Sequence, residues 1–422
     1  MTLSSSGFDN LGISPSLLAV LAGLKFDEPT PIQRQAIPEA IAGHDLIGIA
    51  QTGTGKTLAF GIPMVQRLAT SHRTGLVLVP TRELAIQVNE TLTRLTTAMR
   101  LRTALLIGGE SMYTQIQRLR QDPCIIVATP GRLNDHLNQR RLRLDSVGVL
   151  VLDEADRMLD MGFYPQIERV LEALPKDRQT LLFSATLPAT IASMAAKHLR
   201  EPRRVEVAPS GTAATLVTQE MFVVRRERKA DLLGELLKDS QGPVLLFVRT
   251  KRGASRVASG LRDMGHSAAE IHADRTLPQR KRALSGFKSG EYRVLVATDI
   301  AARGIDVNGI ELVVNYDLPD DPENYVHRIG RTGRAGRSGR AVTLATPDQG
   351  REVREIEKVL HTSIPRLEHP VVEGEAFSHA GSSAPRAPHF SRGGGPRPAR
   401  RPQGGGLPRQ GSSFSFRPRR RR

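Results

Sequence analysis

The sequence contains no tryptophan, one cysteine and few aromatic residues, and each scarcity excludes a class of protein. Aromatic side chains make up 4% of the 422 residues, so stacking of bases on aromatic rings cannot be the main means of holding a nucleic acid. The lone cysteine, Cys124, excludes intramolecular disulfides and metal sites built from cysteines. Because Cys124 heads the apolar run 124–128, we expect it to be a buried thiol in a strand.

Long apolar runs are also missing, and the charge is one-sided. No stretch of about 18 apolar residues occurs, and residues 1–7 have neither the basic start nor the apolar core of a secretory signal. A cytoplasmic protein without membrane spans is therefore expected. The 60 Lys and Arg residues outnumber the 43 Asp and Glu residues, for a formal net charge of +17. This excess favours a polyanionic partner, with acidic substrates as the alternative.

Short β-branched runs alternate with longer amphipathic stretches in two successive sets. The first set comprises residues 76–79, 125–127, 149–152 and 181–183, and the second comprises 244–248, 293–296, 312–314 and 341–344. This alternation predicts an α/β fold with two units, each built on a parallel sheet. The predicted domains are 1–208 and 217–368, joined by a linker at 209–216 that follows a breaker-rich stretch beginning at residue 201. The Arg/Gly/Pro-rich tail 369–422, with 11 Arg and no acidic residue from 376 onward, is expected to be disordered.

A Gly-rich turn follows the apolar run 46–49 and precedes a helix-like stretch. It matches a phosphate-binding P-loop except at its first glycine position, and its residues are Ala50, Gln51, Thr52, Gly53, Thr54, Gly55, Lys56 and Thr57. The glycines let backbone N–H groups approach phosphate oxygens, Lys56 adds a charge for the β and γ phosphates, and Thr57 can hold Mg²⁺. A chance Gly-rich turn is the alternative, which the flanking strand and helix disfavour.

Adjacent carboxylates follow the predicted strand 149–152. Asp153 is suited to hold Mg²⁺ through its water shell, and Glu154 to orient or deprotonate an attacking water in phosphoryl transfer. A strand's carboxyl end is where open α/β sheets place ligand chemistry. Taken alone, the acidic run 153–156 is more often a solvated turn. The P-loop upstream reverses that preference.

Taken in order and spacing, six motifs resemble the DEAD-box ATP-dependent RNA helicases. They are residues 50–57, 80–85, 129–132, 153–156, 184–186 and 327–334, and the resemblance runs from about Phe8 to about Leu360. It implies two tandem RecA-like domains, with ATP and Mg²⁺ as cofactors. The segment 351–360 followed by 364–366 is similar to the bacterial RhlE-type branch.

The resemblance also implies an adenine reader in residues 26–33. There Gln33 would pair with the exposed edge of adenine and Phe26 would lie against the ring. An amide offers one donor and one acceptor, which matches adenine and mismatches guanine. Phe8 would support this loop, with plain core packing as the alternative.

RNA-backbone contacts are implied in both domains, with little sequence specificity. In the first domain they fall on Pro80, Thr81, Arg82, Gly109, Thr129, Pro130, Gly131 and Arg132. In the second domain they fall on Arg249, Thr250, Gln279, Arg282 and Thr298. Ordinary strand-to-helix turns and plain surface polarity are the alternatives.

The remaining family roles link the two domains. Arg331 and Arg334 would be arginine fingers on the γ-phosphate, and Asp306 would accept from the ribose hydroxyl with Gly304 close to the nucleotide. Ser184 and Thr186, with Asp156 and His327, would couple hydrolysis to duplex opening.

Three functions compete on this basis. The first is an RNA-dependent ATPase that unwinds short RNA duplexes or remodels RNA–protein complexes by ATP-driven domain closure. The second is a DNA-translocating helicase, which residues 26–33 and 153–156 disfavour. The third is a non-enzymatic RNA-annealing or clamp protein that relies on the tail, which Lys56 and Glu154 disfavour. RNA is the expected partner, ribosomal or RNA-decay partners stay open, and no membrane is expected.

Overall fold

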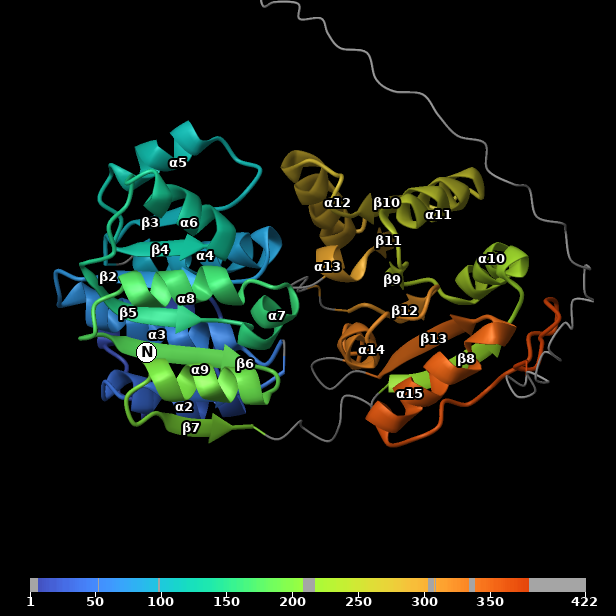
Figure 1. Cartoon of the computed structure of the whole chain (residues 1–422), viewed down its shortest axis with the longest axis horizontal. Coiled ribbons are helices and arrows are strands. Elements are labelled where there is room, and N and C mark those ends of the chain that lie inside the picture. Colours follow the sequence, from blue (N-terminus) through green and yellow to red (C-terminus); the bar gives the residue numbers. More distant parts are fainter. Residues whose placement is uncertain are drawn as a thin grey trace, which may run out of the picture. The chain divides into compact units, whose positions relative to one another are not determined.

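Two parallel sheets organise the chain (Figure 1), which confirms the predicted α/β class with two sheet-based units. The computed structural model describes residues 7–51, 53–97, 99–207, 217–302, 307, 309–333 and 338–378. The first sheet has the strand order β3-β4-β2-β5-β6-β1-β7, and the second has the order β10-β11-β9-β12-β13-β8. The pairings within both sheets are parallel. The predicted linker 209–216 lies outside the described residues.

The strands of the first sheet are β1 (Leu46–Ile49), β2 (Thr74–Leu78), β3 (Thr103–Leu106), β4 (Ile125–Ala128), β5 (Val147–Leu152), β6 (Gln179–Ser184) and β7 (Arg203–Glu206). Those of the second sheet are β8 (Val217–Val223), β9 (Val244–Phe247), β10 (Ala268–Ile271), β11 (Val294–Ala297), β12 (Leu312–Asn315) and β13 (Gly339–Ala345). All eight predicted apolar runs coincide with strands of these sheets.

The helices of the first domain are α1 (Pro15–Gly23), α2 (Pro31–Ile41), α3 (Lys56–Ala69), α4 (Arg82–Thr97), α5 (Met112–Leu119), α6 (Pro130–Asn138), α7 (Ala155–Asp160), α8 (Tyr164–Ala173) and α9 (Ala189–His198). Those of the second are α10 (Lys229–Asp239), α11 (Lys251–Asp263), α12 (Leu277–Ser289), α13 (Asp299–Ala302), α14 (Pro322–Ile329) and α15 (Gly350–Leu360), with 3₁₀ turns η1 (Arg226–Arg228) and η2 (Pro347–Gln349). Within the described ranges, no helix combines the length and apolar character needed to cross a bilayer.

Helices lie on both faces of the first sheet (Figure 1). Alternate residues of its strands face opposite layers, and both sets are buried. In β5, Val149 and Val151 pack in one core with α1–α4, whereas Leu150 and Leu152 pack in another with α6–α9. The second sheet divides in the same way between two cores. This burial on both faces explains why the central strands are continuous apolar runs, and it leaves the carboxyl ends of the strands as the edge where polar loops gather.

Two local predictions are corrected. Residues 203–206, taken as part of a breaker-rich stretch, form β7, which pairs with β1 at the sheet edge. Only Val205 of this strand is buried, so it lacks the apolar run that identifies a central strand. Cys124 is half-buried and precedes β4, because the strand begins at Ile125.

The boundary predicted for the tail is also corrected. Residues 369–378 were expected to be disordered, but they lie along the second domain. Val372 is 2% exposed, Glu375 donates its backbone N–H to the Val223 carbonyl at 2.7 Å, and the Arg366 guanidinium lies 4.6 Å from the Phe377 ring centroid. These apolar and backbone contacts stabilise the segment despite its irregular structure. The rest of the predicted tail lies outside the described residues.

Candidate active site and phosphate groove

The P-loop joins β1 to α3 and is shaped by two left-handed glycines. Gly53 and Gly55 both have φ of +88°, a region that other residues adopt only with strain. Lys56 is 6% exposed, and its Nζ donates to the Ala50 carbonyl at 2.9 Å. The lysine therefore bends back over the turn, and the loop has its cradle shape already. Thr57 is half-buried one residue into α3, and Thr52 lies outside the described residues.

Asp153 and Glu154 follow the carboxyl end of β5 and are buried. Burial raises the pKa of Asp153 to about 6, although the nearby Lys56 charge acts in the opposite direction. Glu154 adopts a left-handed backbone with φ of +53°, and its N–H donates to Asp153 Oδ1 at 3.0 Å. Its Oε2 accepts from Arg157 Nη1 at 2.7 Å, and both of these side chains are 3% exposed. Arg157 was not predicted as a site residue, because its only local signal is its position three residues after Glu154.

These residues fit a magnesium ion. The described residues contain no group of three or more His, Cys, Asp or Glu side chains that could enclose a metal. Mg²⁺ is usually held by one or two protein oxygens, with water and substrate phosphate completing the shell. The Asp153 carboxylate and the Thr57 hydroxyl are such oxygens. Burial raises the pKa of Asp153, and a bound cation would stabilise its carboxylate.

The four residues predicted to couple hydrolysis to duplex opening lie together. Asp156 Oδ2 accepts from the backbone N–H groups of Ala185 and Thr186 at 3.0 Å each and from the Thr186 hydroxyl at 3.2 Å. Ser184 Oγ accepts from the Asp156 N–H at 3.2 Å. His327 lines a cavity of about 410 Å³ with Asp156 and Thr186. Burial, together with the Arg157 charge, lowers the pKa of His327 to about 4, so its ring is neutral near pH 7.

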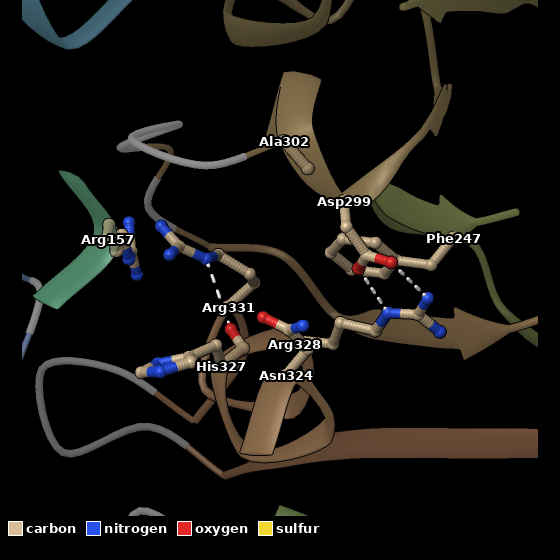
Figure 2. Close-up of a pocket in the computed structure, with 8 residues that line it drawn as sticks. All are labelled: Arg157, Phe247, Asp299, Ala302, Asn324, His327, Arg328 and Arg331. Atoms are coloured by element: carbon tan, nitrogen blue, oxygen red, sulfur yellow. Dashed lines mark hydrogen bonds and ion pairs between the residues drawn. The ribbon is translucent and has the colours of Figure 1, made fainter. Parts of the chain in front are cut away.

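Arg331 contributes a second buried guanidinium beside this set. Its side chain is 3% exposed, and its Nε donates to the His327 carbonyl at 3.3 Å. Figure 2 shows the Arg331 guanidinium directed toward Arg157, and both residues line a small cavity of about 20 Å³. Arg328 points the other way and binds both carboxylate oxygens of Asp299, at 2.6 and 2.7 Å (Figure 2). Gly304, Asp306 and Arg334 lie outside the described residues.

The predicted adenine reader borders the P-loop. Gln33 is 3% exposed, its Nε2 donates to the Gly55 carbonyl at 2.9 Å, and its Oε1 accepts from the Thr30 N–H at 2.9 Å. An amide has two N–H groups and two acceptor lone pairs, so one of each remains for a base edge. Phe26 is 40% exposed, as a ring available to a ligand must be, whereas Phe8 is 1% exposed in the core.

A groove of about 450 Å³ collects most of the first-domain residues predicted to contact RNA. They follow the ends of β2, β3 and β4, and those that line it are Pro80, Thr81, Arg82, Gly109, Thr129, Gly131 and Arg132. Gly109 has φ of +80°, and a Cβ there would lie 2.5 Å from Arg82 Nη1. The backbone must therefore be glycine for the arginine to lie over it. Pro130 is buried at the start of α6 and does not line the groove.

The predicted contacts of the second domain do not line this groove. Thr250 and Gln279 cap α11 and α12, Arg282 is 77% exposed on its side chain, and Arg249 pairs with Asp320 at 3.0 Å. Thr298 follows β11 and is also absent from the groove lining.

Arg280, which the sequence analysis passed over, lines the groove instead. Its Nη2 lies 2.7 Å from Glu83 Oε2, in an ion pair between the two domains in which both side chains are almost fully buried. Burial raises the pKa of Glu83 and lowers that of Arg280. Leu277 of the same helix packs in the core of the first domain. The site thus draws residues from both sheets.

A P-loop, buried carboxylates, a facing arginine and an adjacent polar groove on tandem parallel-sheet domains define a P-loop nucleoside triphosphatase of the helicase type. Residues 30–194 match the DEAD/DEAH box helicase model, and residues 228–336 match the helicase conserved C-terminal domain. The ATP-dependent RNA helicase CshA of Limosilactobacillus reuteri is 44% identical over 381 residues, which cover 89% of this chain and 76% of the relative. CshA of Bacillus subtilis strain 168 is 44% identical over 370 residues, covering 87% of this chain and 75% of the relative. This chain belongs to the DEAD-box family of ATP-dependent RNA helicases.

Solved structures agree. The chain is similar to S. cerevisiae Dbp5 bound to RNA and ADP BeF3, with a TM-score of 0.77 and 32% identity over 86% of this chain and 96% of that one. The DEAD-box helicase Mss116 bound to ssRNA and UDP-BeF gives a TM-score of 0.78 at 28% identity, covering 85% of this chain and 78% of that one.

Proposed function

We propose that the chain hydrolyses ATP in response to RNA and uses closure of two RecA-like domains to unwind short RNA duplexes or remodel RNA–protein complexes. One observation carries the proposal. The carboxyl ends of the first-sheet strands hold both the phosphate cradle with its carboxylates and the groove, and residues of the second domain line the cavities beside each. Nucleotide and RNA can therefore both stabilise the same contact between the domains. As a result, each ligand should raise the affinity of the protein for the other.

We propose the following nucleotide roles. Gln33 and Phe26 bind the adenine, and the loop 50–57 binds the phosphates. Lys56 replaces its hydrogen bond to the Ala50 carbonyl with bonds to phosphate oxygens. Asp153 and Thr57 hold Mg²⁺, which neutralises phosphate charge when bound. Glu154 orients the attacking water. Further groups are supplied by the second domain: Arg331 and Arg334 stabilise the transition state, and Gly304 and Asp306 contact the nucleotide.

The RNA role rests on the groove. Arg82 and Arg132 supply guanidinium groups, and the turns at 108–109 and 129–131 supply backbone groups, which together suit phosphate rather than base edges. We extend the binding track to Arg249, Thr250, Gln279, Arg282 and Thr298 of the second domain. Sequence-independent RNA binding follows, with a strong dependence on salt.

We further propose domain limits at 1–208 and 217–368, a cytoplasmic location, and ribosomal or RNA-decay complexes as sites of action. The segment 351–360 followed by 364–366 supports placement in the RhlE-type branch. Both relatives compared above are named CshA.

The deciding test measures ATP turnover with and without single-stranded RNA, with single-stranded DNA as the comparator and Glu154→Gln as the control. We expect strong stimulation by RNA alone, absent from the variant, followed by unwinding of a short RNA duplex. Equal stimulation by DNA would favour a translocase. Turnover that is absent in the parent protein while RNA still binds would favour an annealing or clamp protein.

A further inference from the structure

A buried polar link lies behind the groove, and neither of its two residues is part of the groove lining. It joins Gln115 on α5 to His136 on α6, and both side chains are 0% exposed. Gln115 Nε2 donates to the Ile107 carbonyl at 2.8 Å and to Glu110 Oε2 at 3.3 Å, and Gln115 Oε1 lies 3.1 Å from His136 Nε2. The amide therefore connects the loop after β3 with α6.

The partners determine the proton positions in this link. The Ile107 carbonyl and the Glu110 carboxylate only accept hydrogen bonds, so the Gln115 amide nitrogen must face them and its oxygen must face the histidine. His136 Nε2 is then the donor, which leaves Nδ1 as the bare ring nitrogen. That nitrogen is buried and has no hydrogen-bond partner. Burial lowers the pKa of His136, in agreement with a neutral ring of this tautomer.

Both ends of the link lead to groove residues. Glu110 directly follows Gly108 and Gly109, and its carboxylate is held by Arg118 through two bonds of 2.8 Å. The Glu110 carbonyl accepts from Arg132 Nη1 at 3.0 Å. Arg132 lies one helical turn before His136, so the link and this second bond join the same loop to the same helix.

We propose that Gln115 and His136 are positioning residues that hold the 108–110 loop and Arg132 in register, and thereby set the affinity of the groove for single-stranded RNA. This inference rests on the proposed function, because it assigns the link to the RNA groove. The 108–110 loop and α6 follow different strands, so breaking the link would allow their groups to shift relative to each other in the groove. A positional error at a binding site weakens binding even where the fold survives.

The test compares Gln115→Leu with a matched control, Gln179→Leu. Gln179 is 3% exposed and donates to two carbonyls, those of Ala40 and His44, at 2.8 Å each. It opens β6 and is thus at the amino-terminal edge of the sheet, opposite the groove. Gln115→Leu removes the side-chain donor of the Ile107 carbonyl, and Gln179→Leu removes that of the His44 carbonyl, so both should lower the free energy of unfolding similarly. Only Gln115→Leu should raise the RNA concentration for half-maximal ATPase stimulation, by about 5- to 50-fold, with kcat at saturating RNA within about twofold.

A second pair of variants keeps the test independent of folding. His136→Gln retains a donor for Gln115 Oε1, whereas His136→Phe retains a ring without one. We expect the glutamine variant to bind RNA at least about fivefold more tightly than the phenylalanine variant. Equal RNA responses of Gln115→Leu and Gln179→Leu, or of the two His136 variants, would overturn the inference. Loss of RNA stimulation from the unsubstituted protein would instead defeat the proposed function.

Discussion

Replacing Asp153 with asparagine should stabilise the nucleotide-free protein while abolishing its activity. The carboxyl is 2% exposed, and burial holds its pKa at about 6 instead of the ordinary 3.8. One pKa unit corresponds to about 1.4 kcal/mol, so the ionised form lowers the free energy of unfolding by about 3 kcal/mol at neutral pH. Asparagine has nearly the shape of the neutral acid, and its oxygen can still accept from the Glu154 N–H.

The sign of the pH dependence follows from linkage. Because the folded protein binds this proton more tightly than the unfolded chain does, the penalty is absent below about pH 4 and grows as the pH rises toward 6. The stability gained by Asp153→Asn should therefore be about 1 kcal/mol at pH 4.5 and about 3 kcal/mol at pH 7.5. Addition of Mg²⁺ and ATP should remove this difference in stability, because the metal would stabilise the Asp153 carboxylate of the parent and not the amide of the variant.

Equilibrium urea unfolding followed by circular dichroism at both pH values measures these differences. Asp156→Asn is the matched control, because Asp156 Oδ2 accepts from three donors of residues 185–186 and Oδ1 accepts from the Arg157 N–H, so an amide nitrogen at either position would face a donor. The free energy of unfolding of this control should be lower than that of the parent by about 2 kcal/mol or more at pH 7.5. If Asp153→Asn were no more stable than the parent at pH 7.5, attraction by Lys56 would outweigh burial and the reasoning would be wrong.

Other predictions concern the domain contact, the P-loop and the C-terminal segment. Glu83→Gln and Arg280→Gln should each weaken RNA-stimulated turnover. The double substitution should weaken it by less than the sum of the two single effects, and a double-mutant cycle should give a coupling free energy of about 1–3 kcal/mol. Gly55→Ala should abolish binding in a fluorescent-nucleotide titration, because its φ is +88° and the added Cβ would lie 2.4 Å from Gln33 Nε2. Phe377→Ala should lower the melting temperature through the lost ring contacts, whereas no change would place residues 369–378 outside the folded domain.

The central strands could be predicted because burial on both faces requires continuous apolar runs. Residues 149–152 show this in β5, where every position is buried. The edge strand β7 lacks that signal, since only Val205 of its four residues is buried. Strand β3 has an alternating pattern of buried positions, which is weaker over four residues than a continuous run. Position within the sheet, and not strand propensity alone, thus determined which strands could be predicted from the sequence.

The same difference separates the site residues that could be predicted from those that could not. The P-loop and the carboxylates lie within short local patterns whose chemistry dictates their spacing. Arg280 meets Glu83 across 197 positions of sequence, and Gln115 meets His136 across 21. No local sequence pattern predicts contacts between residues so far apart in the chain. The missed groups are also mostly partners of the predicted ones, as Arg157 is of Glu154.

The partners found in the structure imply that nucleotide binding and hydrolysis face different barriers. Lys56 and Gln33 are bonded to carbonyls of the P-loop, and a phosphate or a base edge can replace or share such bonds at little net change in free energy. Glu154 is instead held in a buried ion pair with Arg157, whose separation costs about 3–5 kcal/mol unless another charge compensates. Arg331 lines the cavity beside that pair, and the RNA groove is bridged by the same domain. We therefore expect hydrolysis to be the step that depends on the arrangement of the second domain, and through it on RNA.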